Sequence, residues 1–282
     1  MLQHALRLKN SPLVHVLTQV AFPPVPSWTE RVPELRKSFY DNGFQHYRDT
    51  ETTEVMFEVP GRGGAPNVHQ RAIPFHEFAD RDGRFAFQLT EAAIVLHTTG
   101  YKDFQHFTEL LSNGLRLVRD VLGIHVVSRI GLRYVDLVQA GTGSELAQFV
   151  KPGLLGFPFR EVPELGVALA AFNSHTVGRT SLGALAVRSM TLPPGQYLPH
   201  DLDIAGLRPP ERVQLTQPSI LLDFDHYSIF TGAGASVPPI DFDVEAILRH
   251  VEQLHGVLKA AFLASVTDLA IKHWGPWEAV PV

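Results

Sequence analysis

The sequence predicts an α+β fold, in which two halves of antiparallel, curved β-sheet are each covered by amphipathic helices and the chain closes with a long C-terminal helix. Three observations support this class. Short runs of β-branched and aromatic residues recur along the chain, and two long segments carry apolar residues at helical spacing. The 22 glycines and 21 prolines among 282 residues supply many turns, which disfavours a bundle made only of helices.

The N-terminal half, residues 1–140, is expected to begin with one strand and one helix. Residues 13–22 alternate as a strand does, and their even-numbered side chains, Val14 among them, are expected to face a core. Ser27 and Glu30 have the spacing of a capping box, in which each side chain reaches a backbone N–H of the first helical turn. A helix is therefore predicted to start there.

The rest of this half is expected to hold a meander, a second helix and a further strand. Asp103 has the position of a helix cap, and Gly123 stands where that helix is expected to end. Residues 124–138 then predict another strand. The meander is predicted from four β-rich runs, at 53–59, 70–78, 84–90 and 92–99.

A segment rich in Gly and Pro, residues 141–163, predicts the junction between the two halves. The C-terminal half, residues 164–282, then resumes with β character. A hairpin is predicted from 166–176 and 180–191, and a strand from 219–230.

The clearest helix of the chain is predicted at its C-terminal end. Asp241 or Asp243 is expected to cap it, and residues 244–272 repeat apolar side chains with a period near 3.6. We expect one continuous helix that packs across a sheet. A proline-rich loop, 193–218, precedes this region and offers an extended surface to a partner.

Composition excludes several classes of function. With 24 basic and 29 acidic residues, the net charge of −5 disfavours a broad surface for duplex nucleic acid. The absence of cysteine rules out disulfides, thiolate metal sites and a cysteine nucleophile. Residues 1–10 lack an apolar segment, and the longest apolar stretch, 166–172, is far shorter than the roughly 20 residues of a membrane helix. We therefore expect a cytoplasmic protein that does not enter a membrane.

Residues 127–136 read VSRIGLRYVD, and this motif resembles a sporadically distributed family of uncharacterised bacterial and archaeal proteins. Other short segments fit the same family in the same order, and together they span nearly the whole chain. They are SPLV at 11–14, VAF at 20–22, LDFD at 222–225, and the ending from 255 to 268. The resemblance implies no assigned activity and no catalytic residues. The patchy distribution of the family implies an association with defence or mobile-element loci.

Two arginines are candidates for binding a ligand. In the strand predicted at 124–138, alternation places Arg129 and Arg133 on one face, with Gly131 between them. Their planar guanidiniums suit a phosphate or a carboxylate, and the glycine leaves space for a close approach. The alternative is that acidic side chains of the protein itself satisfy both arginines.

Two aspartates in the strand at 219–230 are the matching acidic candidates. Asp223 and Asp225 share a face, where they are expected to pair with Arg129 and Arg133, or with Arg179 and Arg188. A pair of carboxylates at this spacing also suits Mg²⁺ or Mn²⁺, with His200, Asp201, Asp203 and His226 as helpers. That alternative makes the protein a metal-dependent phosphodiesterase or nuclease. Alternation, however, sends His226 to the opposite face.

No other motif specifies chemistry. The 14 histidines contain no zinc-binding spacing, and the glycine-rich segments at 61–64 and 232–234 are not nucleotide loops. We therefore predict no catalytic residues, no metal and no cofactor. The leading function is a non-enzymatic binding or regulatory module that acts with a protein partner of unknown identity. A local single-strand surface, with Arg71, Arg81 and Arg84 among phenylalanines, stays open as a further alternative.

Overall fold

A computed structural model describes residues 8–58, 67–139, 146–157, 170–196, 206–210, 218–231 and 240–276, and the single positions 164, 166, 198, 202, 213 and 216. The side chains of 52–58 and 67–73 lie outside this description. The predicted junction, the proline-rich loop and both glycine-rich segments fall wholly or partly outside it as well.

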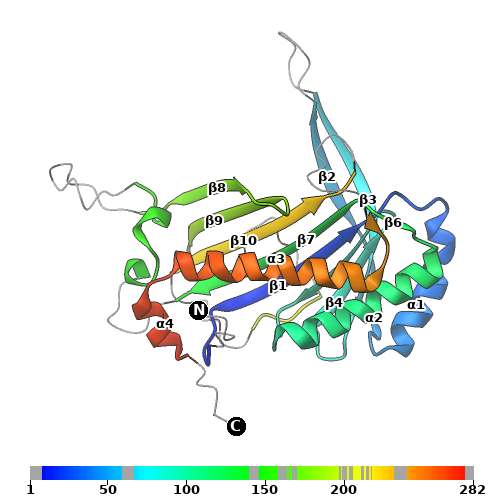
Figure 1. Cartoon of the computed structure of the whole chain (residues 1–282), viewed down its shortest axis with the longest axis horizontal. Coiled ribbons are helices and arrows are strands. Elements are labelled where there is room, and N and C mark those ends of the chain that lie inside the picture. The colour runs from blue at the N-terminus through cyan, green and yellow to red at the C-terminus, as the bar shows by residue number, and fades with distance from the viewer. Residues whose placement is uncertain are drawn as a thin grey trace.

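Nine antiparallel strands form one sheet in the order β2-β3-β4-β5-β1-β7-β10-β9-β8 (Figure 1). A two-residue pairing of β6 with β11 lies apart from this sheet. The strands are β1 Leu13–Ala21, β2 His46–Glu58, β3 Asn67–Ala79, β4 Phe85–Thr90, β5 Ala93–Thr98, β6 Val126–Val127, β7 Arg129–Val138, β8 Asn173–Arg179, β9 Ala184–Leu192, β10 Ser219–Ile229 and β11 Ile240–Asp241.

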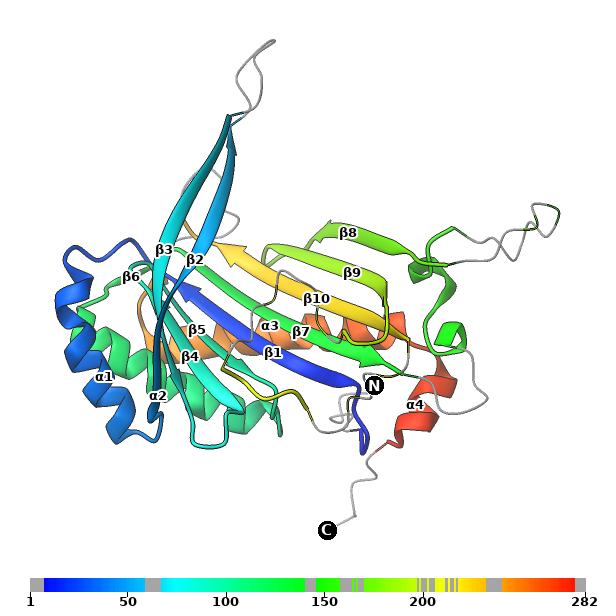
Figure 2. The same ribbon diagram turned by 180° about the vertical axis from the view of Figure 1, so that it is seen from behind.

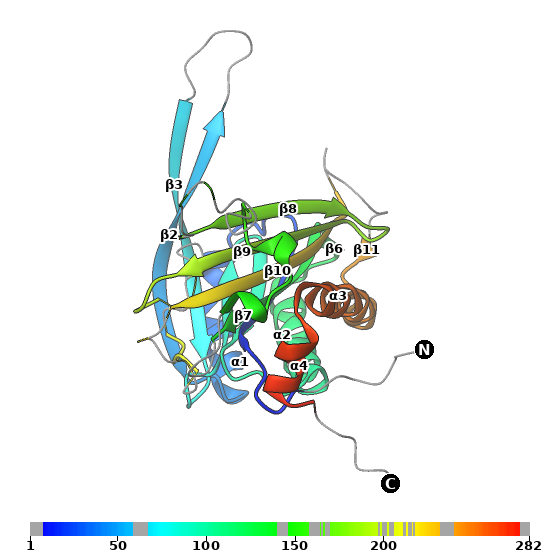
Figure 3. The same cartoon turned by 90° about the vertical axis from the view of Figure 1, so that its left-hand side faces the viewer.

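The helices cover one face of the sheet. Figure 2 shows the opposite face, in which the central strands lie in front of the helices, and the view from the side gathers the helices on one side of the sheet (Figure 3). We call the uncovered side the open face. The helices are α1 Val32–Asp41, α2 Phe104–Leu122, α3 Val244–Ser265 and α4 Asp268–Trp274, with short 3-10 turns at Trp28–Arg31, Leu146–Gln148 and Pro152–Leu154.

The main core lies between the sheet and this helical layer. Even-numbered residues of the central strands, such as Val16, Leu132 and Phe224, are fully buried there against Leu115 of α2 and Leu254 of α3. Alternation along the strands explains this, because successive side chains point to opposite faces. The odd-numbered residues of the same strands therefore point to the open face.

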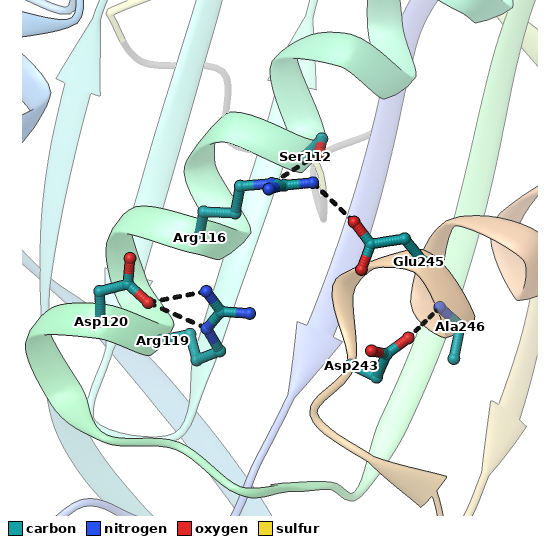
Figure 4. A network of polar contacts seen from close by, with 7 residues as sticks. All are labelled: Ser112, Arg116, Arg119, Asp120, Asp243, Glu245 and Ala246. Carbon is teal, nitrogen blue, oxygen red and sulfur yellow. Dashed lines mark hydrogen bonds and ion pairs between the residues drawn. The ribbon is translucent and has the colours of Figure 1, made fainter.

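Helices α2 and α3 run side by side, and their outer surfaces carry exposed ion pairs (Figure 4). Arg116 of α2 donates to Glu245 of α3 at 2.6 Å, and both side chains are more than half exposed. Asp243 caps α3 by accepting a hydrogen bond from the Ala246 N–H. This result decides between the two caps that the sequence left open, Asp241 and Asp243.

The predicted α+β class, the antiparallel sheet and the long C-terminal helix are confirmed. Strands on either side of the predicted junction at 141–163 are direct neighbours, since β7 pairs with β10 along its length. The division into halves at 1–140 and 164–282, like the curvature of the sheet, stays a prediction.

Three local predictions were wrong. The capping box does not form, because Ser27 adopts a left-handed backbone (φ 54°) and its side chain makes no capping hydrogen bond. The C-terminal helix does not run unbroken to 272: Val266 is extended, and Thr267 caps a separate helix, α4. Val14 lies not in the main core but in a second cluster with Val135.

The position of Val14 follows from an irregularity in β1. The pairing of β1 with β7 shifts register between Leu13 and His15. A bulge of this kind places one extra residue in a strand and interrupts the alternation. Leu13 consequently packs on the main core, while both Val14 and His15 turn to the open face.

Within the described residues, none of the helices combines the length and the apolar character needed to cross a bilayer.

Candidate functional site

A pocket of about 460 Å³ lies on the open face, over the middle of the sheet. Its floor consists of side chains from six adjacent strands, β3, β4, β5, β1, β7 and β10, and Leu202 adds to its wall. The lining residues are His15, Leu17, Gln19, Phe75, Gln88, Thr90, Ala93, Val95, His97, Arg129, Gly131, Arg133, Leu202 and Asp225.

One side of the pocket is anchored by a double ion pair. Asp223 receives two hydrogen bonds from Arg133, from Nε at 2.7 Å and from Nη2 at 2.8 Å. Arg188 of β9 also reaches Asp223, with Nη2 at 2.7 Å from Oδ2. Because both carboxylate oxygens are bound by guanidiniums, Asp223 is a structural partner of the two arginines.

Arg129 is held more loosely. Its guanidinium donates to Gln19 Oε1 and lies 4.6 Å from the centre of the Tyr227 ring. Its distance to Asp225 Oδ2 is 3.8 Å, which is too long for a hydrogen bond. Gly131 makes this position possible, since a β-carbon there would lie 2.8 Å from Arg129 Nη1.

Burial controls the charge of this loose pair. It lowers the pKa of Arg129, against the opposing effect of Asp225 and Tyr227, and it raises the pKa of Asp225, against the opposing effect of Arg129 and Arg133. Each charge therefore loses hydration that its partner does not fully replace. Asp223 and Asp225 face the guanidiniums of this region: Arg133 and Arg188 contact Asp223, and Arg129 lies near Asp225.

His15 is the most unusual residue of the pocket. Its side chain is 1% exposed, and neither ring nitrogen has a hydrogen-bond partner within the described part of the chain. Burial lowers its pKa well below 6.5, and the nearby His97 and Arg133 lower it further. An unsatisfied buried polar group costs about 1 to 3 kcal/mol, so such groups are rare in native proteins and call for a cause.

A second polar cluster adjoins the pocket at His97. Its ring lies 5.8 Å from that of His15, centre to centre, and its Nε2 is 3.7 Å from Glu77 Oε2. Glu77 is 2% exposed and is also contacted by Arg48 Nη2 at 3.1 Å and by Gln88 Nε2 at 3.0 Å. The carboxylate of Glu77 is thus compensated, in contrast to the ring of His15.

Part of the chain between β9 and β10 covers the open face beside the pocket. Residues 206–210 lie near the start of β4, where Arg84 Nη1 donates to the Pro209 carbonyl at 2.8 Å (Figure 2). Leu207 packs on Ala79 and Ala86. These contacts, with those of Leu202, turn a sheet surface into a concave site.

The structure brings the four predicted ligand-binding residues, Arg129, Arg133, Asp223 and Asp225, to one face of the sheet. The expected pairing of Arg133 with Asp223 is confirmed. Gly131 does leave space for a close approach, but the Arg129 side chain fills it. A ligand-binding role for the four residues stays a prediction.

The metal alternative finds little support in this geometry. A cation at Asp223 would displace Arg133 and Arg188. His226 lies on the helix side, where its Nε2 is 2.9 Å from Thr180 Oγ1, and the other helpers, His200, Asp201 and Asp203, lie outside the described residues. Among the described residues, no group of three or more His, Asp or Glu side chains is arranged to hold a metal ion.

The single-strand alternative loses most of its aromatic residues, although Phe75 lines the pocket on the open face. Phe78, Phe85 and Phe87 are buried in the main core, where no base could stack on them. Arg84 is tied to the carbonyl of Pro209, and the side chain of Arg71 lies outside the description.

His15 and His97 were missed at the sequence level, because no spacing links them. The available signal was the alternation of β1, which placed His15 opposite the core-facing set. That signal predicts the open face but not the pocket, which needs β5 and β7 as neighbours on either side of β1.

Comparisons with protein-family models, with curated proteins and with solved structures find no match for this chain. The resemblance carried by residues 127–136 therefore stays a prediction.

Proposed function

We propose that the protein is a non-enzymatic binding module that takes a small anionic ligand in the pocket on the open face, through Arg129 and Arg133. The observation that carries the proposal is Arg129, which lines the pocket and has no carboxylate oxygen at hydrogen-bond distance among the described residues. The buried ring of His15, which has no hydrogen-bond partner in the same part of the chain, marks the open face as the side with unsatisfied polar groups. A bound anion would accept hydrogen bonds from the Arg129 guanidinium.

Arg129 supports the same conclusion. It lines the pocket, donates to the neutral Gln19 and lies 3.8 Å from the Asp225 carboxylate, so an incoming anion would give its guanidinium a closer charged partner. Arg133 is already paired with Asp223 and therefore contributes mainly its charge and the orientation of the site. The lining residues that the structure describes include no serine, cysteine or lysine hydrogen-bonded to a base, so their geometry favours binding over a reaction.

Three expectations from the sequence stay predictions within this proposal. They are a protein partner that responds to the occupied site, a cytoplasmic location, and an association with defence or mobile-element loci. The phosphodiesterase alternative is disfavoured because Asp223 is engaged by two guanidiniums.

Thermal unfolding in the presence of phosphate, sulfate or acetate tests the proposal. A ligand at 100 times its Kd stabilises the native state by about 2.7 kcal/mol, which for a chain of this size raises Tm by roughly 5 °C. Sodium chloride at matched ionic strength controls for screening.

Two variants give the test its specificity. Arg129→Gln should abolish the rise in Tm, because it removes the loosely held guanidinium. Arg116→Gln, the same change at an exposed ion pair on the helix side, should leave it intact. If no anion stabilises the protein, and if Mn²⁺-dependent cleavage of a phosphodiester is lost in Asp223→Asn, the enzyme alternative replaces this proposal.

A further inference from the structure

The lining of the pocket changes in character from one strand to the next. The charged side chains come from β7 and β10: Arg129, Arg133 and Asp225. Among the described lining residues, those from β3, β4 and β5 include no lysine, arginine, aspartate or glutamate. They are Phe75, Gln88, Thr90, Ala93, Val95 and His97. The site thus has a charged end and an uncharged end.

The two ends are well separated. The strand order β4-β5-β1-β7 places three inter-strand spacings between them, or about 14 Å at 4.7 to 4.9 Å each. The volume of about 460 Å³ is also many times the roughly 30 Å³ that one water molecule takes up in the liquid. An inorganic anion at Arg129 would leave the β4–β5 end unfilled.

The uncharged end suits an apolar body with few polar groups. Val95 and Ala93 form its floor, and Phe75 and Leu202 add further apolar surface. The Gln88 amide nitrogen is engaged by Glu77, which leaves the amide oxygen as an acceptor. Ligand pockets commonly combine such apolar walls with a small number of fixed polar groups.

We infer that the pocket takes an organic anion, a phosphate or carboxylate on an apolar body of about the size of an aromatic ring, with the anionic group at Arg129 and the body over β5 and β4. This inference rests on the proposed function and adds the class of ligand to it. Phosphate and carboxylate share the chemistry of the charged end, and the experiment separates them.

Isothermal titration with two series of ligands tests the inference. Inorganic phosphate, methyl phosphate and phenyl phosphate form one series, and acetate and benzoate form the other. We expect phenyl phosphate to bind at least tenfold more tightly than methyl phosphate, or benzoate at least tenfold more tightly than acetate. The series with the tighter ring-bearing member identifies the anionic group.

Val95→Thr examines the uncharged end without changing the shape of the side chain. It should lower the affinity for the ring-bearing ligand at least threefold and leave the affinity for inorganic phosphate unchanged, since the hydroxyl adds polarity far from Arg129. Val177→Thr, on the exposed edge strand β8, is the matched control and should change neither. Ala93→Val, which narrows the same end, provides a second variant with the same expected result.

Equal affinities for inorganic, methyl and phenyl phosphate would overturn the inference of an organic ligand and leave the anion site in place. An equal loss of affinity for all ligands in Val95→Thr would overturn it as well. If none of the five anions binds, the proposed function itself fails.

Discussion

Two histidines on opposite faces of the sheet have different surroundings. On the helix side, His255 is stacked on Phe104, with 4.1 Å between ring centres, and its Nδ1 is 2.7 Å from the Tyr134 hydroxyl. On the open face, His15 is buried more deeply, at 1% exposed, and neither of its ring nitrogens has a hydrogen-bond partner among the described residues. The histidine on the helix side is thus satisfied by the protein, whereas we propose that the open face is completed by a ligand.

The ion pairs show the same contrast between surfaces. Arg116 and Glu245 on the helices are more than half exposed, while Asp223 at the sheet is 5% exposed and binds two arginines. Exposed pairs contribute little, and buried pairs are costly to break. Mutations on the open face should therefore separate binding from stability, which mutations of the core cannot do.

The largest expected loss of stability comes from a mutation on the helix side of the sheet. Phe224→Ala, in β10, removes a fully buried ring and should lower the free energy of unfolding by about 3 to 5 kcal/mol. Tyr227→Ala, on the open face of the same strand, should cost about 1 kcal/mol, mainly its cation–π contact with Arg129. Urea unfolding of both variants measures this difference, and equal losses would contradict a core confined to the helix side.

The next largest loss of stability is expected from breaking the ion pair between Arg133 and Asp223 at the edge of the pocket. Arg133→Met or Asp223→Leu alone should cost about 2 to 3 kcal/mol, because each leaves a partly buried charge without its partner. The double variant should cost less than the sum of the two. The same cycle with Arg116→Met and Glu245→Leu should give changes below about 1 kcal/mol. Strict additivity at Arg133 and Asp223 would show that the two charges do not act together.

Acidification should weaken the fold. The pKa of His15 and that of His255, which is about 4, are lowered in the folded protein, so the unfolded chain binds more protons below pH 6.5. Stability is therefore complete above pH 6.5 and falls as the pH drops, by at most about 1.4 kcal/mol per pH unit for each histidine. His15→Leu cannot take up that proton and should lose less stability between pH 7 and pH 5. A slope as steep as that of the parent protein would exclude His15 from the effect.

The smallest expected change in stability is at Gly131. Gly131→Ala should alter the free energy of unfolding by less than about 1 kcal/mol, since the atoms it meets belong to the end of the flexible Arg129 side chain. It should nevertheless weaken anion binding about tenfold, because the guanidinium must move. Gly256→Ala, at an open position in α3, should stabilise the helix by about 0.5 to 1 kcal/mol and leave binding unchanged. Unchanged binding in Gly131→Ala would indicate that the position of Arg129 does not matter.

Much of the fold could be predicted because it depends on local patterns. Alternation located β1, β7 and β10, and Asp103 caps α2 as its position predicts, by accepting from the His106 N–H at 2.8 Å. The pairing of Arg133 with Asp223 followed from the faces of two strands that turned out to be neighbours. Sequence periodicity was therefore sufficient to predict features that involve a single strand or helix, or two neighbouring ones.

The rest depends on contacts that no local pattern records. The bulge between Leu13 and His15 arises from pairing with β7, and the break at Val266 coincides with a bridge to Val150. The pocket needs side chains from six strands and Leu202 above them. His15 could be assigned to the open face, but its lack of a partner emerges only from the assembled sheet.

The most direct test of the account is a measurement of two histidine pKa values by NMR of the imidazole rings, with and without saturating phenyl phosphate. The account predicts that the ligand raises the pKa of His15, because a negative charge in the same pocket favours the charged form of the ring. The pKa of His255, across the sheet, should stay at about 4. A His15 pKa that is unchanged at saturation, or an equal shift at both histidines, would contradict the claim that the open face is completed by an anion.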